Sequence, residues 1–267
     1  MNSESNLDID HAPNPRSSPG FLTKIFLFLL DFIYILWFLV CSALISVLSF
    51  PFIFCHQCGW KKGKMQTTIR RFIQFYGRWV IRFSWPMIRI KVEIPEEVKK
   101  ADPCVYVLNH FSFADVYFCG FLPGFQTVIA VRSWPFKLPI YNIFMRLAGY
   151  MDVETTSPED ILEAASHILE SGSCILFFPE GHRSKNGQLL PLQKGAFRIA
   201  AENRVPLVPV AIEGTECFGG YKSKFLWPCR VRLRFFPPLL AQDTSLASVN
   251  DLRNRVKALF LLEVYGK

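Results

Sequence analysis

The segment from Val105 to Asp115 ends an apolar run with a histidine and an aspartate at a spacing that suits acid–base chemistry. Val-Tyr-Val-Leu is typical of a buried strand, and Asn109 and His110 follow where that strand would end. If a helix begins just after it, Asp115 lies in the first turn and faces back towards the His110 ring. The carboxylate would fix one ring nitrogen, and the other would take a proton from a substrate hydroxyl. The alternative is a helix-capping aspartate beside a strand-end histidine with no catalytic role.

A second strand end carries complementary chemistry. Residues Ile175 to Ser184 read Ile-Leu-Phe-Phe-Pro-Glu-Gly-His-Arg-Ser, so charge and backbone freedom arrive directly after an apolar run. Gly181 permits a positive φ, and Arg183 offers a planar fork suited to phosphate or carboxylate. One such loop alone would be read as a surface turn. A base at one strand end and an anion clamp at another together favour a functional site.

These segments resemble the glycerolipid acyltransferases typified by 1-acyl-sn-glycerol-3-phosphate acyltransferase. The resemblance runs from about Lys91 to the C-terminus, and its first and third blocks are the most specific. In chain order the four blocks are Asn109-His110 with Asp115, the region Arg132 to Thr155, the run Phe178 to Ser184, and the run Val208 to Ile212.

The resemblance implies an enzyme that moves a fatty acyl group from acyl-CoA or acyl-carrier protein to the hydroxyl of a lysophospholipid. It implies that His110 is the general base, that Asp115 orients it, and that no cofactor or metal is bound. It also implies a set of substrate-binding residues: Arg132, Glu180, Gly181, His182 and Arg183 for the acceptor, and Pro209 within the Val-Pro-Val block for the acyl or acceptor cleft.

Three departures from the family pattern concern the acceptor. His182 stands where the family usually has threonine, and Arg132 stands where it usually has lysine. The second block usually ends in Ile-Asp-Arg, but here it reads Val153-Glu154-Thr155, without the arginine. A phosphate site on Arg132 and Arg183 is still expected. Glycerol 3-phosphate, another lysophospholipid or an amino-acid lysolipid remain alternative acceptors, and an inert lipid-binding module is the alternative to an enzyme.

The elements that must position these residues form an alternating pattern. From Ile88 onward, expected strands at 89–94, 105–108, 127–131, 175–178, 207–212 and 231–235 alternate with helices at 115–120, 140–148, 158–171, 194–203 and 249–264. Ser157, Pro158 and the two acids after them form a helix start with an N-cap, a first-turn proline and first-turn charges. This alternation predicts an α/β fold, a mixed sheet flanked by helices, over residues 91–267.

The N-terminal part predicts a membrane segment at 21–58 after a disordered tail at 1–20. Phe32 to Phe54 contains 23 uncharged residues, and about 20 suffice to cross a bilayer. A cleaved secretory signal is the competing interpretation, but the run is too long and no small-residue cleavage site follows. We expect the segment to span, with the tail outside. A shallow hairpin broken near Pro51 is the alternative.

The net charge of +8 is concentrated just after this segment. Between Phe32 and Val92 there are nine basic residues and no acidic one, a pattern typical of contact with anionic lipids on a cytoplasmic flank. The catalytic domain is therefore expected on the cytoplasmic face. No zinc-finger, RRM or basic-zipper pattern accompanies the charge, so nucleic-acid binding is not expected.

Residues 59–90 are expected to form a basic amphipathic helix. Within Met65 to Arg89, apolar residues recur on one helical face and arginines on the opposite one, Arg71, Arg78, Arg82 and Arg89. We expect this helix to lie at the membrane surface, and packing of its apolar face on the domain is the alternative.

The eight cysteines do not predict a disulfide framework. Several lie inside apolar runs, and the catalytic half is expected to be reduced and cytosolic. Cys55-His56-Gln57-Cys58 has metal-like spacing, but no second pair completes it, so a structural or lipid-modified thiol is favoured there.

Overall fold

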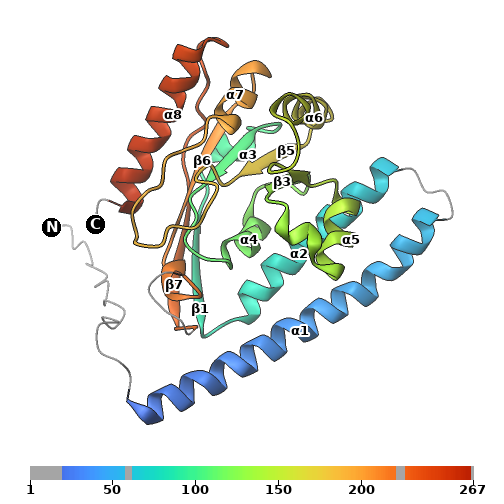
Figure 1. Cartoon of the computed structure of the whole chain (residues 1–267), viewed down its shortest axis with the longest axis vertical. Helices are drawn as coiled ribbons and strands as arrows, with labels where there is room; N and C mark the ends of the chain where they lie inside the picture. The colour runs from blue at the N-terminus through green and yellow to red at the C-terminus, as the bar shows by residue number, and fades with distance from the viewer. Residues whose placement is uncertain (1–19, 58–61, 221–225, 266–267) are drawn as a thin grey trace.

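The computed structural model describes residues 20–57, 62–220 and 226–265, and its centre is a seven-stranded sheet (Figure 1). The strand order is β1-β7-β6-β2-β5-β3-β4, and every pair is parallel except β6 with β7. The strands are β1 (Ile88–Glu93), β2 (Val105–Leu108), β3 (Thr127–Val131), β4 (Met151–Asp152), β5 (Cys174–Phe177), β6 (Leu207–Glu213) and β7 (Cys229–Phe235).

Helices cover both faces of the sheet, so the central strands β2 and β5 are buried and apolar throughout. Alternate residues of β2 enter two separate cores. The core with Val105 and Val107 is closed by α6 (Pro158–Glu170), α7 (Gly195–Glu202) and α8 (Leu246–Phe260). The core with Tyr106 and Leu108 is closed by α2 (Lys62–Phe83), α3 (Glu96–Lys99) and α4 (Asp115–Phe118). The remaining helices are α1 (Phe21–Gln57) and α5 (Pro139–Ala148).

The predicted mixed α/β architecture is confirmed, but several boundaries are corrected: β7 begins at Cys229 instead of 231, α8 begins at Leu246 instead of 249, and α3 and β4 were not predicted. Strands β2 and β3 have the predicted bounds, and Ser157 caps α6 by accepting a hydrogen bond from the backbone N–H of Asp160. The helix expected over 59–90 ends at Phe83, because β1 begins at Ile88 inside that range. The tail predicted at 1–20 lies, except for Gly20, outside the described residues, as do Cys58 and residues 59–61.

Helix α1 is long and apolar enough to cross a membrane, judged by length and composition. It continues through Pro51, so the break near Pro51 that the alternative hairpin requires is not found. It runs antiparallel to α2 (Figure 1): the Ser42 hydroxyl lies 2.7 Å from that of Tyr76, and Tyr34 bonds the Ser84 hydroxyl. Asp31 accepts a hydrogen bond from the backbone N–H of Leu226 in the domain. The middle of α1 is therefore docked on the protein.

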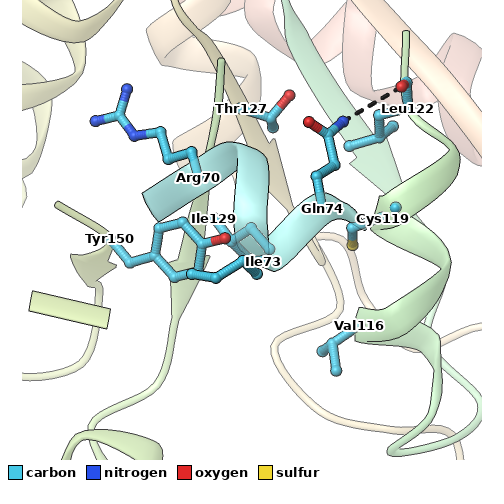
Figure 2. A pocket seen from close by; sticks show the side chains of 10 residues that line it. Arg70, Ile73, Gln74, Val116, Cys119, Leu122, Thr127, Ile129 and Tyr150 are labelled. Carbon is cyan, nitrogen blue, oxygen red and sulfur yellow. Dashed lines mark hydrogen bonds between the residues drawn. The ribbon is translucent and has the colours of Figure 1, made fainter. Parts of the chain in front are cut away.

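Helix α2 packs one face on the domain. This face buries Met65, Ile69 and Ile81, but also Arg70 and Gln74. Figure 2 shows these two polar side chains beside a small cavity of about 20 Å³ between α2 and the sheet. Arg70 donates to the carbonyl of Ala148, and Gln74 donates to that of Leu122. The outer face of α2 exposes arginines and aromatic residues, Arg71, Phe75, Trp79, Arg82 and Phe83.

Candidate active site

The His110–Asp115 pair forms as the spacing predicts. His110 Nδ1 lies 2.8 Å from Asp115 Oδ2, at the point where β2 ends and α4 begins. The aspartate is fully buried, and its Oδ2 also accepts the backbone N–H groups of Phe111 and Ser112 at 2.7 and 2.8 Å. The carboxylate is thereby fixed, and it places the Nδ1 proton. The His110 side chain keeps 17% of its surface exposed, and among the described residues none bonds its Nε2.

The backbone of His110 is held by the second strand-end loop. Its N–H donates to Glu180 Oε1 at 3.0 Å, and its carbonyl accepts the Ser184 N–H at 2.9 Å. The Phe178 ring lies against the imidazole, with ring centroids 4.4 Å apart. The two loops meet because β2 and β5 are parallel neighbours whose carboxyl ends lie at one edge of the sheet.

Glu180 is a positioning group in this arrangement. It is only 3% exposed, and its second oxygen accepts the backbone N–H of Leu190 at 2.9 Å. Burial raises the pKa of this carboxyl, and the hydrogen bonds from Leu190 and His110 oppose that rise. The Tyr265 hydroxyl, from a π-helical turn at Leu261–Tyr265, lies 3.4 Å from Oε1. The sequence-based expectation of an acceptor contact at Glu180 stays a prediction, and the observed contacts are with the protein itself.

Asn109, the residue before His110, is bonded to the neighbouring strand β6. It is fully buried, donates to the carbonyl of Ile212 at 3.0 Å and accepts the N–H of the same residue at 2.8 Å. These two bonds continue the β2–β6 ladder by one residue through a side chain. The structural roles of Asn109, Phe178 and Tyr265 were missed from sequence. Asn109 had a signal, a polar residue at the end of an apolar run, whereas Tyr265 had none.

A polar cluster lies at the end of β3. Arg132 Nη1 donates a hydrogen bond to His182 Nδ1 at 3.0 Å. Its Nη2 donates to Glu154 Oε1, and Glu154 Oε2 accepts the Ser133 N–H at 3.1 Å. These two bonds lower the pKa of Glu154 to about 2. The structure thus brings the predicted residues Arg132 and His182 together, and it adds an acid that balances the arginine.

The other predicted site residues occupy different settings. Arg183 is exposed and forms no ion pair with any residue that the structure describes. Gly181 has φ +69°, the freedom expected of it, and its N–H closes a turn onto the Phe178 carbonyl. Pro209 is buried in β6 opposite Val107, and its carbonyl accepts the N–H of Phe236, so a role for it in lining a cleft stays a prediction.

An apolar cavity of about 120 Å³ lies beside the loop that joins β2 to α4. Two of its lining residues, Phe113 and Ala114, directly precede Asp115. The others come from α1, α2, α4 and the segment before β7: Tyr34, Ile35, Phe38, Val80, Ile81, Tyr117, Phe218 and Leu226. The docking of α1 on the domain creates this cavity, since α1 supplies one wall.

Comparison with known proteins places this chain in a family. Residues 89–213 match the family model described as Acyltransferase. The chain is 34% identical over 151 residues to a chloroplastic 1-acyl-sn-glycerol-3-phosphate acyltransferase of Brassica napus, covering 55% of this chain and 44% of that protein. It is 30% identical over 192 residues to an uncharacterized acyltransferase of Schizosaccharomyces pombe, covering 67% of this chain and 68% of that protein.

A solved structure shares the fold. The crystal structure of the 1-acyl-sn-glycerophosphate acyltransferase from Thermotoga maritima superposes with a TM-score of 0.71 at 23% identity, covering 91% of this chain and 97% of that one. The chain spans about half the length of the first plant relatives that it matches. The residues matched by the family model include the dyad and the loop that holds it, and the chain belongs to the acyltransferase family.

Proposed function

We propose that this protein transfers a fatty acyl group from an acyl thioester to the free hydroxyl of 1-acyl-sn-glycerol 3-phosphate at a membrane. The observation that carries the proposal is the His110–Asp115 contact of 2.8 Å, with the histidine backbone anchored on both sides and Nε2 left for a substrate. Relatives named 1-acyl-sn-glycerol-3-phosphate acyltransferase support this choice of acceptor.

The reaction follows from the orientation of the imidazole. Asp115 holds the proton on Nδ1, so Nε2 takes the proton of the acceptor hydroxyl as its oxygen attacks the thioester carbonyl. When the carbon–sulfur bond breaks, the thiolate of CoA or acyl-carrier protein recovers that proton from the imidazolium. A new oxygen ester and a free thiol result.

Direct attack by the acceptor hydroxyl needs no acyl-enzyme intermediate. The state of Cys119, the cysteine near the dyad, agrees with a reaction that does not use a cysteine nucleophile. Burial raises the pKa of the Cys119 thiol, so little thiolate forms at neutral pH. Its sulfur lies 3.9 Å from the Asp115 carbonyl, and no base is arranged to activate it among the described residues.

The acceptor phosphate would bind near Arg132, His182 and Arg183. Arg132 and His182 already contact each other, and Arg183, the residue after His182, is exposed. Glu154 competes for Arg132, however, and this contact favours a second candidate, an acceptor with less negative charge such as a lysophospholipid with a capped phosphate or an amino-acid lysolipid. Glycerol 3-phosphate remains a further alternative acceptor.

The apolar cavity suits part of an acyl chain. Its volume of about 120 Å³ approaches the roughly 150 Å³ of an apolar cavity that stays dry and takes a benzene-sized ligand. The cavity therefore has room for a short stretch of hydrocarbon. Because Phe113 and Ala114 line the cavity, the hydrocarbon would lie next to the loop between His110 and Asp115.

The membrane contact would use the outer faces of α1 and α2. Trp37, Trp79 and Phe83 are partly exposed and form one aromatic group across the two helices, with Trp79 stacked on Phe83 at 4.7 Å. Aromatic rings and arginines together are typical of the headgroup region.

Because Asp31 and Ser42 bond the rest of the protein, the middle of α1 would lie along the domain, with its outer face in one leaflet. Tail and domain would then lie on the cytoplasmic side, in contrast to the spanning arrangement expected from sequence.

Two experiments test these proposals. Purified protein in mixed micelles receives acyl-CoA or acyl-carrier protein with lysophosphatidic acid, glycerol 3-phosphate, a capped lysophospholipid or an amino-acid lysolipid. Fastest transfer to lysophosphatidic acid supports the proposed acceptor; faster transfer to any of the other three acceptors contradicts it. For topology, a cysteine is placed at Ser5 in one variant and at Lys185 in another. Each variant is labelled with a thiol reagent added outside intact cells. Protection of both supports the in-plane α1, and labelling at Ser5 alone supports a span.

A further inference from the structure

Two cysteines and an aspartate meet at the edge of the sheet opposite the dyad. The register pairs Val105 of β2 with Ile175 of β5, so Cys104 and Cys174 stand side by side at the amino ends of these parallel strands. Their sulfurs are 3.7 Å apart. Asp102 Oδ1 lies 3.0 Å from the sulfur of Cys174 and 3.8 Å from that of Cys104.

These distances fit the edges of a tetrahedral metal site. With zinc–sulfur bonds of about 2.3 Å, a tetrahedral angle separates two sulfur ligands by about 3.8 Å. A zinc–oxygen bond of about 2.0 to 2.2 Å places sulfur and oxygen roughly 3.6 Å apart. The observed sulfur–sulfur distance matches the first value, and the two sulfur–oxygen distances lie on either side of the second.

The surroundings provide donors and an entry path. Both cysteines are buried, whereas Asp102 is exposed, so a cation can arrive from the Asp102 side. The hydroxyl of Tyr106 lies 3.4 Å from Asp102 Oδ1. Space beside the carboxylate depends on Gly124, because a Cβ there would approach Asp102 Oδ2 to 2.9 Å. The competing interpretation is two buried thiols that hydrogen-bond a carboxylate.

We propose that Asp102, Cys104 and Cys174 bind a thiophilic divalent cation of the zinc class, with water as the fourth ligand. The cation replaces the two thiol protons, which pass to solvent, and three negative ligands then hold a doubly charged ion. Bound there, it ties the starts of the two strands whose far ends carry His110 and Glu180. The spacing in sequence did not indicate this cluster, since Cys104 and Cys174 are 70 residues apart.

A disulfide is the main rival use of the two thiols. It would require the sulfurs to close from 3.7 Å to about 2.05 Å, with loss of two electrons and two protons to an oxidant. It would leave Asp102 without a role. A metal site uses all three groups at their present spacing.

The test titrates cobalt(II), and then zinc in competition, into the reduced full-length protein in detergent. Cys55 and Cys58 are first changed to serine, because their spacing could bind metal independently. The proposal predicts about one cobalt per chain, with thiolate-to-cobalt charge-transfer absorption that zinc removes. Cys104→Ser and Cys174→Ser should each abolish this absorption, and Asp102→Asn should weaken cobalt binding at least tenfold. Cys41→Ser, in α1, is the matched control and should change nothing.

X-ray absorption of the zinc-loaded protein supplies a readout that does not depend on how a variant folds. Two sulfur scatterers at about 2.3 Å and light-atom neighbours at about 2.0 Å are expected. An absence of stoichiometric thiolate absorption in the Cys55 and Cys58 background would overturn the proposal. So would unchanged binding in Cys174→Ser, or mass spectrometry that finds Cys104 and Cys174 joined as a disulfide in protein that binds no cation.

Discussion

The Glu180 carboxylate accepts a hydrogen bond from the backbone N–H of His110 at 3.0 Å, so one strand-end loop holds the proposed base of the other. The second oxygen of Glu180 accepts the Leu190 N–H, and neither oxygen is left exposed to bind a substrate. The proposed function gives the loop at 180–184 two tasks. Its buried acid and Ser184 fix the histidine, and its exposed His182 and Arg183 would bind the acceptor.

Glu180→Gln should separate these tasks. The glutamine oxygen can accept one of the two backbone N–H groups, and its amide group faces the other, which costs about 1 to 3 kcal/mol for a buried donor. We expect a lower melting temperature and a lower kcat, with little change in the KM for the acceptor. Glu163→Gln, on the exposed side of α6, is the control. A raised acceptor KM at unchanged kcat would show instead that Glu180 binds substrate.

Asp115→Asn should impair transfer and lower the melting temperature. An amide group in the place of Oδ2 donates to His110 Nδ1, which forces the ring proton onto Nε2 and removes the base, but it also faces the backbone N–H groups of Phe111 and Ser112 that Oδ2 accepts. A fall in kcat of about 10² to 10⁴ is expected, the usual range for losing a general base. The measurement is single-turnover acyl transfer, with Asp160→Asn at the exposed start of α6 as the control. Transfer within a factor of about three of the parent protein would contradict the orienting role.

Glu154→Gln should strengthen binding of a phosphate-bearing acceptor, because it releases Arg132. Because the pKa of Glu154 is lowered, its ion pair with Arg132 is fully formed above the ordinary glutamate pKa. The ion pair is lost only as pH falls through about 2. Glu154 therefore stays charged from pH 5 to 9, and the variant should lower the KM for lysophosphatidic acid by a similar factor throughout. Glu202→Gln, which removes the partner of Arg198, is the control. An unchanged KM would show that Arg132 does not contact the acceptor phosphate.

Val80→Phe should shift the preferred acyl chain to a shorter one. Val80 is buried on α2 and lines the apolar cavity, so a phenyl ring there fills the space. Overpacking typically costs about 1 to 3 kcal/mol of the free energy of unfolding, so a loss of stability within that range is expected. The check is competition among acyl-CoA donors of different length. Val47→Phe, at an exposed position of α1, is the matched control. If both variants keep the same chain preference, the cavity does not hold the acyl chain.

The sequence predicted individual helices and strands better than the contacts between them. Apolar runs bounded by turn residues located β2 and β3, and cap chemistry located α6, because these signals are contained within a few neighbouring residues. The His110–Asp115 contact was predictable for the same reason. The clamp of Glu180 on His110 was not, since it depends on which strands become neighbours. The helical wheel did not indicate that Arg70 and Gln74 of α2 are also buried, because the carbonyl groups that satisfy them belong to distant segments.

The account depends most on His110 as the base, and this is tested by acyl transfer from acyl-CoA to lysophosphatidic acid in His110→Ala. His167→Ala is the matched control, since that histidine is exposed on α6 and its ring pairs only with Glu163 and Glu170 among the described residues. The account predicts that His110→Ala loses about 10² to 10⁴ in kcat at an unchanged melting temperature, while His167→Ala keeps full activity. Equal turnover in the two variants would contradict it.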